Sequence, residues 1–212
     1  MNEKVKTTMK ALERNNISSY YVDKKEEVIP LVETLIKEGD TVSVGGSMSL
    51  FECGIIDYLR CGKYEFFDRY VDGLGGAEIE KIYRASFDAD AYFCSSNAVT
   101  ENGELYNVDG NSNRVAAIAY GPRKVIMVVG INKIVKDIDE AVLRVKRIAA
   151  PKNAVRLHCN TYCAKEGHCV KNDATFDGCA SKDRLCINRL ITHGQRQKER
   201  INVIFVGESL GY

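Results

Sequence analysis

Residues 95–114 gather carboxylates, amides and an arginine in one short stretch of the chain. The segment reads SSNAVTENGELYNVDGNSNR, and its polar side chains include Asn97, Glu101, Glu104, Asn107, Asp109, Asn113 and Arg114. Such side chains can bind a ligand through hydrogen bonds, and a carboxylate among them can act as a general base or a nucleophile. A structural role is the alternative, because Asn-Gly and Asp-Gly form ordinary turns and Asp109 can pair with Arg114. We expect this segment to be a polar loop.

A second candidate site is the sequence Gly45-Gly46-Ser47, with Ser49 two residues further on. It lies between a β-branched segment, 41–44, and the helical pattern LFECGIIDYLRCG. Glycines allow close approach of a ligand to the backbone, and the free N–H groups of a helix start suit phosphate or carboxylate. A tight turn is the structural alternative, and the motif matches neither the P-loop nor the dinucleotide-binding pattern. Because both segments follow expected strands, we predict that they meet in one cleft that binds a small anionic ligand.

A third candidate is the cysteine-rich stretch at residues 158–187. Its metal-site candidates are Cys163, Cys169, Cys179 and Cys186, spaced C-x5-C-x9-C-x6-C. Four thiolates are a complete ligand set for a structural zinc ion or an iron–sulfur cluster, although the tight C-x2-C pairs of many such sites are missing. Cys159 and His158 are substitute ligands. The alternative is that these are small buried or oxidation-prone thiols, as we expect of the isolated core cysteines Cys53, Cys61 and Cys94.

The elements that must position these residues alternate between helical patterns and short apolar runs. Helical patterns are expected over residues 3–15, 24–38, 77–90 and 137–150, the last ending before Pro151, and the apolar runs include AYFC, KVIMVVGI and INVIFVGE. Continuous apolar runs are typical of strands buried on both faces. The pattern predicts an α/β fold with a mostly parallel sheet and helices on both faces. We expect a single domain over residues 1–212, with 158–187 as a cysteine-rich insert.

The composition excludes several classes of partner. Thirty basic and 29 acidic side chains nearly cancel, so nucleic acid and anionic membranes are not expected as partners. The apolar runs are far shorter than the ~20 residues of a membrane span, and the charged N-terminus does not resemble a signal peptide. We therefore expect a cytoplasmic protein, in which clustered cysteines bind metal or do redox chemistry more often than they form disulfides.

The chain resembles the lactate-utilisation (LUD) domain family. The resemblance rests on GGSMSLFECGI, on SSNAVTENGELYNVDGNSNRVAAIAYGPRKVIMVVGINKI, on AAPKNAVRL and on the terminal VGESLGY. It implies the phosphosugar isomerase/CoA-transferase-like fold and a role beside iron–sulfur proteins in lactate oxidation. CoA transferases of this broader fold present a nucleophilic glutamate in a Ser-Glu-Asn-Gly turn. The similar TENG sequence makes Glu101 the first candidate for a catalytic carboxylate, with Gly45, Gly46 and Ser47 as the facing anion cradle.

Three functions remain open at this level. The first is an accessory or redox subunit of hydroxy-acid metabolism that carries a cysteine-ligated zinc ion or iron–sulfur cluster and works with iron–sulfur electron-transfer proteins. The second is an enzyme that acts on a small carboxylate or an acyl/CoA-type substrate through Glu101. The third is a ligand-binding sensor without catalytic activity. A homo-oligomer is compatible with each of the three.

Overall fold

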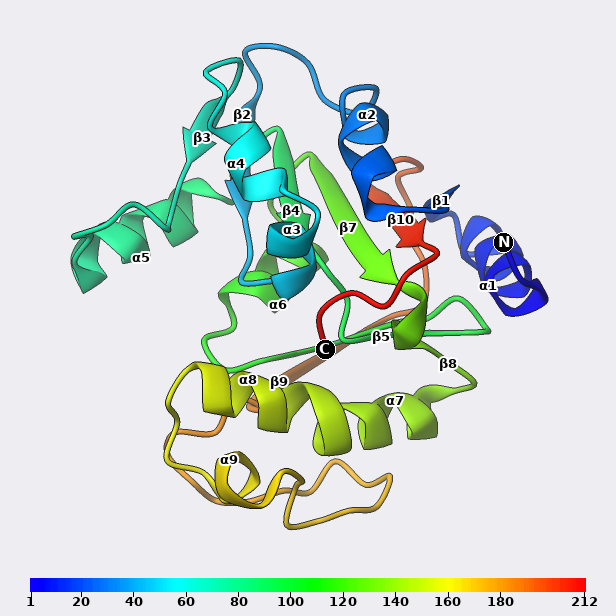
Figure 1. Ribbon diagram of the computed structural model, residues 1–212, viewed down its shortest axis with the longest axis vertical. Coiled ribbons are helices and arrows are strands. Elements are labelled where there is room, and N and C mark those ends of the chain that lie inside the picture. Colours follow the sequence, from blue (N-terminus) through cyan, green and yellow to red (C-terminus); the bar gives the residue numbers. More distant parts are fainter.

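The central sheet contains six strands that all run parallel, in the order β1-β10-β7-β4-β2-β3. The computed structural model describes residues 1–212 (Figure 1). The strands are β1 (Ser18–Val22), β2 (Thr41–Val44), β3 (Glu65–Phe67), β4 (Ala91–Cys94), β7 (Lys124–Gly130) and β10 (Ile201–Val206). Helices cover both faces of this sheet, which confirms the fold class predicted from the alternating sequence pattern.

The two faces of the sheet bury alternate residues of the same strands. Ile126 and Val128 of β7 pack against α2 (Val28–Val32), α3 (Met48–Glu52) and α4 (Ile55–Leu59). Their neighbours Val125, Met127 and Val129 pack on the opposite face, against α1 (Glu3–Arg14) and α6 (Asn113–Ala119). Successive side chains of a strand point to opposite faces, so a strand covered on both sides needs an unbroken apolar run. The sequence of β7 meets this requirement.

A second, four-stranded sheet has the order β8-β5-β6-β9. It contains β5 (Ala98–Thr100), β6 (Leu105–Asp109), β8 (Ile134–Val135) and β9 (Asn188–Thr192). The stretch expected to be a polar loop therefore forms the antiparallel β5–β6 hairpin followed by α6. The physical reason is the pattern of apolar residues between the polar ones: Val99 and Leu105 pack towards the central sheet, whereas Ala98 and Tyr106 pack towards the helix on the other side.

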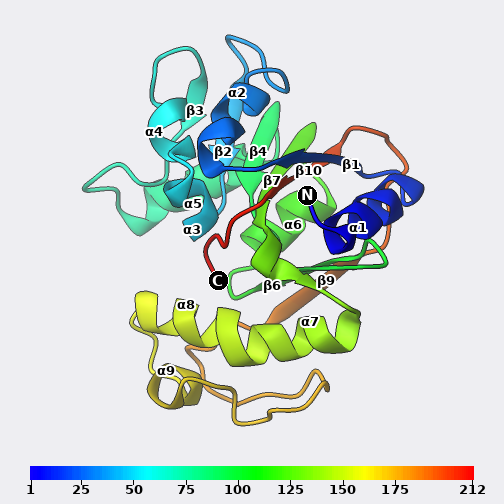
Figure 2. The same ribbon diagram turned by 45° about the vertical axis from the view of Figure 1, so that its right-hand side comes forward.

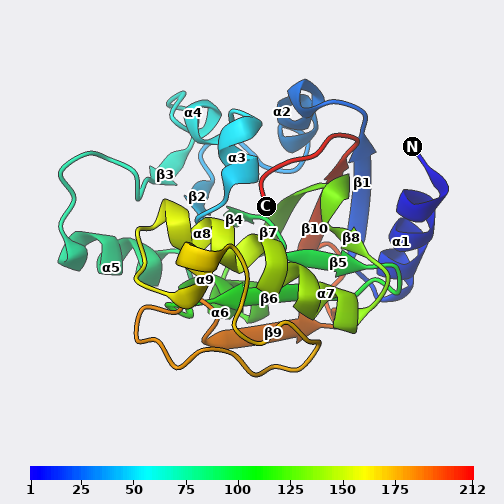
Figure 3. The same ribbon diagram turned by 60° about the horizontal axis from the view of Figure 1, so that its bottom comes forward.

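That helix is a continuous rod that crosses the second sheet (Figure 3). It comprises α7 (Ile138–Arg144), the π-helical segment η3 (Val145–Ala149) and α8 (Ala150–Arg156). The expectation that the helix ends before Pro151 is thus wrong. Proline lacks an N–H group, which normally breaks the i→i−4 ladder. Here Pro151 lies in the first turn of α8, directly after the wider π-helical turn, so the rod continues with local readjustment instead of ending.

Three other expected helices are shorter than their sequence patterns, including that over residues 77–90, of which α5 (Gly76–Ala85) ends five residues early. The segment 24–38 forms the 3-10 turn η1 (Lys25–Glu27) and α2, after which the chain continues in turns. The pattern after β2 is divided into α3 and α4 by Gly54, which has a left-handed backbone with φ of 68°. The remaining helix is α9 (Tyr162–Glu166), and η2 (Ile131–Lys133) is a further 3-10 turn. No helix has both the length and the apolar character that crossing a bilayer requires.

The cysteine-rich stretch covers the outer side of the α7–α8 rod (Figures 1 and 2). Its single helix, α9, lies beside α8, and the following chain returns to the second sheet as β9. The molecule thus contains two places where chemistry-bearing side chains gather. One lies between the central sheet and α8, and the other lies between the rod and the cysteine-rich stretch.

Candidate functional site

A cavity of about 260 Å³ lies at the carboxyl ends of the central strands. Its walls come from the segment after β2, the segment after β4, the start of α6, the end of η2 and the polar side of α8. The lining side chains that matter for chemistry are Ser47, Arg69, Ser95, Asn97, Asp109, Asn113, Arg114, Lys133, Arg156 and Tyr212. The carboxyl ends of parallel strands are where ligands collect in open α/β sheets.

The cavity carries an excess of positive charge. Arg69, Arg114, Lys133 and Arg156 line it, and Asp109 is the one carboxylate among the lining residues. None of these side chains forms an ion pair with a carboxylate of the protein. Cations gathered in a partly dry cavity repel one another and lose hydration, and both costs fall when an anion enters. The electrostatics of the cavity therefore favour a negatively charged ligand.

Arg114 fastens the walls of the cavity to one another. Its guanidinium donates hydrogen bonds to Asn107 Oδ1 at 2.6 Å and to Asn97 Oδ1 at 2.8 Å. It also donates to the carbonyl oxygens of Val108 and Ser95, at 2.7 and 3.1 Å. These acceptors are neutral, so the arginine keeps its full charge while its orientation is fixed. Asn107 does not line the cavity, and it acts there only by orienting the guanidinium of Arg114.

Asp109 forms no ion pair with these cations, and backbone N–H groups occupy its carboxylate. Oδ2 accepts from the backbone N–H groups of Arg114 and Val115, and Oδ1 accepts from that of Asn111. These bonds stabilise the first turn of α6, whose N-cap residue Ser112 has a left-handed φ of 68° and gives no side-chain cap. Asp109 therefore shapes the site through the backbone.

Lys133 is the most buried of the cations, with 3% of its surface exposed. Its Nζ donates to Ser49 Oγ at 2.9 Å and to Ser95 Oγ at 3.0 Å. Burial, together with repulsion from Arg144 and Arg114, lowers the pKa of Lys133 to about 7. The neutral form of the Lys133 amine is thus accessible near neutral pH.

Two buried hydroxyl groups of the cavity lack a hydrogen-bond partner within the protein. They are Ser47 Oγ, just after β2, and the hydroxyl of Tyr212 near the end of the chain. A buried hydroxyl without a partner costs roughly 1–3 kcal/mol, so native proteins seldom leave one unpaired. The guanidinium of Arg69, which also lines the cavity, lies 5.4 Å from the ring of Tyr70 and 4.8 Å from that of Tyr83. These groups offer both donors and a positioned charge to a ligand.

The structure brings together part of the set predicted from the sequence. Gly46, Ser47, Asn97, Asp109, Asn113 and Arg114 line the cavity, so the two segments share one cleft. Ser49 lies behind the wall and holds Lys133. Gly45 is required for packing, because a Cβ there would lie 2.8 Å from the hydroxyl of Tyr92 and 3.2 Å from Cδ of Arg114.

Glu101 and Glu104 lie away from this cavity, at the turn of the β5–β6 hairpin. Glu101 follows the last residue of β5 and faces α1, where its carboxylate is 3.5 Å from Lys4 Nζ. Glu104 accepts a hydrogen bond from Thr100 Oγ1 at 2.7 Å and lies 3.4 Å from His193 Nδ1. The hairpin separates its turn from Asn97 and Asp109 at its other end. Glu101 does not line the cavity, and its catalytic role stays a prediction from the sequence.

Several residues of the cavity escaped the sequence analysis. Ser95 carried a usable signal, since it directly follows the buried run AYFC, and Lys133 comes two residues after the end of the run KVIMVVGI. Arg69, Arg156 and Tyr212 carried none, because they come from a loop, from α8 and from the chain end. Only tertiary packing places those three beside the strand ends.

The four predicted metal-site cysteines line a second, small cavity of about 30 Å³ under the α7–α8 rod. Cys163, Cys169, Cys179 and Cys186 share this cavity with apolar side chains of the rod, including Val142 and Ala150. Burial raises the pKa of the Cys186 thiol, and the other three cysteines raise it further by repulsion. Cys159 and His158 do not line this cavity. Of the cysteines expected in the core, Cys53 and Cys94 are buried, whereas Cys61 is exposed in the turn after α4.

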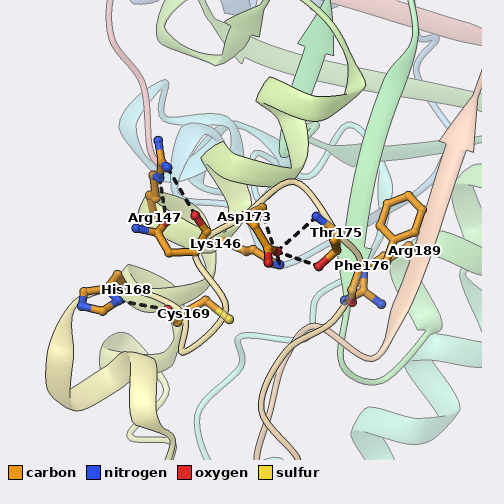
Figure 4. A network of polar contacts seen from close by, with 9 residues as sticks. Lys146, Arg147, His168, Cys169, Asp173, Thr175, Phe176 and Arg189 are labelled. Atoms are coloured by element: carbon orange, nitrogen blue, oxygen red, sulfur yellow. Dashed lines mark hydrogen bonds and ion pairs between the residues drawn. The ribbon is translucent and has the colours of Figure 1, made fainter.

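Polar contacts fasten the cysteine-rich stretch to the rod (Figure 4). Lys146 Nζ lies 3.1 Å from Asp173 Oδ1, and the backbone N–H of Cys169 donates to the carbonyl of Lys146 at 2.9 Å. Hydrogen bonds from Thr175 and Lys146 hold the pKa of Asp173 at about 2. Further along, Arg189 of β9 donates to the carbonyl of Phe176 at 2.7 Å. The thiols are thus presented by a segment that is anchored on both sides.

The residue types around this second cavity are those of a zinc or iron–sulfur site, since four cysteines line it. The sulfur atoms are not arranged in a coordination geometry, because no three His, Cys, Asp or Glu side chains are close enough to hold one ion. A metal would therefore require the thiols to move closer together. The chemistry of the donors fits, whereas their spacing is that of four separate thiols.

Residues 5–206 match the family model described as the LUD domain. The chain belongs to the LUD domain family. Among solved structures, a DUF162 family protein from Deinococcus radiodurans is similar, with a TM-score of 0.53 and 17% identity over 96% of each chain. At that identity the similarity shows the fold alone. A search of curated proteins found no match. The fold of the LUD domain does not by itself specify a function, which depends on the residues that line its cavities.

Proposed function

We propose that this LUD domain protein binds a small anion, of the carboxylate or phosphate class, in the cavity at the strand ends. The observation that carries the proposal is the excess of cations around the cavity, with Arg114 held by neutral acceptors and Lys133 held by serine hydroxyls. The unpartnered hydroxyls of Ser47 and Tyr212 support it, since an anionic oxygen would accept from both. A volume of about 260 Å³ suits a compact metabolite.

The family resemblance suggests which anions to test first and in which metabolic process the protein would act. Hydroxy acids of the lactate type carry the carboxylate that the cations would bind and a hydroxyl that Asn97 or Asn113 could recognise. In this setting the protein would be an accessory subunit of small hydroxy-acid metabolism, working beside iron–sulfur electron-transfer proteins. Anion binding is common to this role, to an enzyme and to a sensor, so it is the property to test first.

The test is thermal unfolding of the purified protein with increasing L-lactate, D-lactate or inorganic phosphate, and with chloride at matched ionic strength. A ligand that binds the folded state stabilises it by about 2.7 kcal/mol at 100 times its dissociation constant. We expect at least one of the three anions to raise the melting temperature in a saturable way. No saturable effect from any of them, relative to chloride, would overturn the proposal.

A matched pair of variants locates the binding. Arg156→Gln removes a cavity charge whose guanidinium donates to the neighbouring Asn153. Arg123→Gln is the control, because Arg123 is highly exposed and pairs with Asp90 outside the cavity. We expect Arg156→Gln to weaken the bound anion roughly tenfold, or about 1.4 kcal/mol, and Arg123→Gln to leave its affinity unchanged. Equal effects of the two would place the anion elsewhere.

We also propose a second function, a metal or iron–sulfur site formed by the four cysteines. The supporting observation is that all four predicted ligands line one cavity although up to 23 positions separate them in the chain. Cys163 and Cys169 would supply ligands from the α9 side, and Cys179 and Cys186 from the returning chain. A bound zinc ion would cross-link the stretch, and an iron–sulfur cluster would add electron transfer.

Metal and acid-labile sulfide analysis of protein purified without oxygen tests this second function. We expect close to one equivalent of zinc, or iron with matching sulfide, in the wild-type protein. Cys186→Ser should lower that content strongly, whereas Cys61→Ser, which changes an exposed cysteine outside the cavity, should not. Negligible iron and zinc in the wild type, with freely titrating thiols, would reduce the stretch to a cysteine-rich surface segment.

A further inference from the structure

The bottom of the cationic cavity holds a lysine between two serine hydroxyls. Lys133 Nζ lies 3.0 Å from Ser95 Oγ and 2.9 Å from Ser49 Oγ. A buried lysine usually pairs with a carboxylate, yet no carboxylate lies within ion-pair distance of this one. Lys133 is therefore not part of a structural ion pair. Its arrangement is that of a base beside a hydroxyl group, with a second hydroxyl to orient the base.

The two serines are not equivalent in their access to a ligand. Ser95 lines the cavity, at the point where the chain leaves the carboxyl end of β4. Ser49 is completely buried in α3 and does not line the cavity. The Ser95 hydroxyl can therefore meet a bound molecule, whereas the Ser49 hydroxyl can only hold the amine in place. The carbonyl of Ser95 accepts from Arg114 at 3.1 Å, which fixes the backbone beneath the hydroxyl.

The surroundings of Lys133 allow it to give up its proton near neutral pH. Burial is the main cause, and repulsion from the neighbouring cations Arg144 and Arg114 adds to it, so the pKa of Lys133 falls to about 7. Glu52 and Cys94 act weakly in the opposite direction. Arg144 is itself held by the carbonyls of Asn132 and Asn97, at 3.2 and 2.6 Å, so its charge stays beside the amine. An amine in this state can accept a proton from a neighbouring hydroxyl.

We infer that Ser95 is a nucleophile and Lys133 its general base in an acyl-transfer reaction on a small anionic ester or thioester. Ser95 Oγ would attack the carbonyl carbon while its proton passes to Lys133 Nζ. The bond to the leaving alcohol or thiol then breaks, and Lys133 returns the proton to that leaving group. Water releases the acyl group from Ser95 as a carboxylic acid by the same proton relay. Ser49 is a positioning residue in this scheme.

The inference rests on the proposed function in one respect: the cations Arg69, Arg114 and Arg156 must hold the anionic end of the substrate. The substrate class follows from this requirement. It is an acyl compound small enough for about 260 Å³ that carries a carboxylate or phosphate besides the reacting carbonyl. A neutral ester of the same size lacks the group that the cations bind, so it should react more slowly.

The experiment uses the half-ester 4-nitrophenyl succinate as the probe and neutral 4-nitrophenyl acetate as its comparison. Release of nitrophenol is followed over a range of pH, and the acylated residue is located by peptide mass spectrometry after rapid quenching. We expect a succinyl group on Ser95 and a rate that rises with pH through a midpoint near the pKa of Lys133, about 7. Faster reaction with the anionic probe than with the neutral one is expected as well.

Variants separate catalytic from structural effects. Ser95→Ala should abolish the adduct, and Lys133→Met should slow its formation by roughly 100-fold or more, the usual contribution of a general base. Ser95→Cys should restore acylation at position 95. Ser49→Ala should lower the pH midpoint, since a hydroxyl that accepts from the charged amine is lost. The exposed Ser209→Ala is the control and should match the wild type.

Two results would overturn the inference: acylation of Ser95→Ala at the wild-type rate, or a succinyl group mapped to any residue other than Ser95. Saturable anion binding by the same wild-type preparation, measured by its melting temperature, keeps the two proposals apart. If anions bind but Ser95 is never acylated, the acyl-transfer inference fails and the anion-binding function stands. If no anion binds, the proposed anion-binding function is wrong, and the acyl-transfer inference that rests on it is wrong as well.

Discussion

Lys133→Met should abolish a pH dependence of stability that the wild-type protein carries between about pH 7 and pH 10.5. Burial, with help from Arg144 and Arg114, lowers the pKa of Lys133 from 10.5 to about 7 in the folded protein. The unfolded chain regains the ordinary value, so within this window it binds a proton that the folded protein does not. Wild-type stability should therefore rise with pH across the window. Below pH 7, where both states are protonated, the group lowers stability by a constant amount and adds no pH dependence.

The magnitude follows from the size of the shift. A change from 10.5 to about 7 corresponds to at most ~5 kcal/mol of unfolding free energy. Of this amount, roughly 2.5 kcal/mol should be recovered between about pH 7.5 and about pH 9.5, because the proton that the chain takes up on unfolding becomes harder to obtain as the pH rises. Methionine carries no charge, so the variant lacks this contribution. The stability of Lys133→Met relative to the wild type should fall by that amount over the same interval.

Urea unfolding at the two pH values measures the effect, and the comparison of variants cancels groups that titrate in all of them. Lys136→Met is the matched control, because Lys136 is exposed three residues away and should follow the wild-type curve. The decisive quantity is the change with pH in the difference between variant and wild type. If the curves of Lys133→Met and the wild type run parallel, the amine is not desolvated in the folded protein and the reasoning about its proton is refuted.

Three further predictions concern other parts of the chain. Glu101→Gln should leave anion binding unchanged and cost less than about 1 kcal/mol of stability, because its pair with Lys4 is partly exposed; loss of binding or of a measured activity would restore Glu101 as a functional carboxylate. Gly103→Ala should destabilise the protein by about 1–3 kcal/mol in urea unfolding, since φ is +82° and a Cβ would lie 2.7 Å from the backbone of Ala11. Gly39→Ala, with φ of +86° and open space around it, should cost less, and equal losses would show that the contact with α1 is not rigid. Lys146→Met should loosen the cysteine-rich stretch, seen as faster hydrogen exchange over residues 168–177 with the central sheet unaffected, whereas unchanged exchange there would show that the ion pair with Asp173 does not anchor the stretch.

The sequence by itself determined the four inner strands of the central sheet, β2, β4, β7 and β10. The runs that form β4, β7 and β10 are apolar except for Lys124 and Asn202, because both faces of each strand are covered. Such runs can be recognised without knowing what covers them. The same local logic placed Gly46 and Asn97 at strand ends, and therefore in one cleft. The cysteines were recognisable from their type and number, and the structure collects four of them around one cavity.

Tertiary structure alone decided which polar residues face the cavity and which do not. Glu101 and Asn97 are neighbours in the same polar stretch, yet the β5–β6 hairpin carries Glu101 to its turn beside α1 and leaves Asn97 at the strand end. Arg156 reaches the cavity because a π-helical turn lets the rod continue through Pro151. Lys133 looks like any other lysine in the sequence, and its lowered pKa arises from the burial and the arginines that folding places around it. The local pattern of apolar residues shows whether one or both faces of a strand are buried. The proton affinity of a side chain, in contrast, depends on charges brought near it from distant positions in the chain.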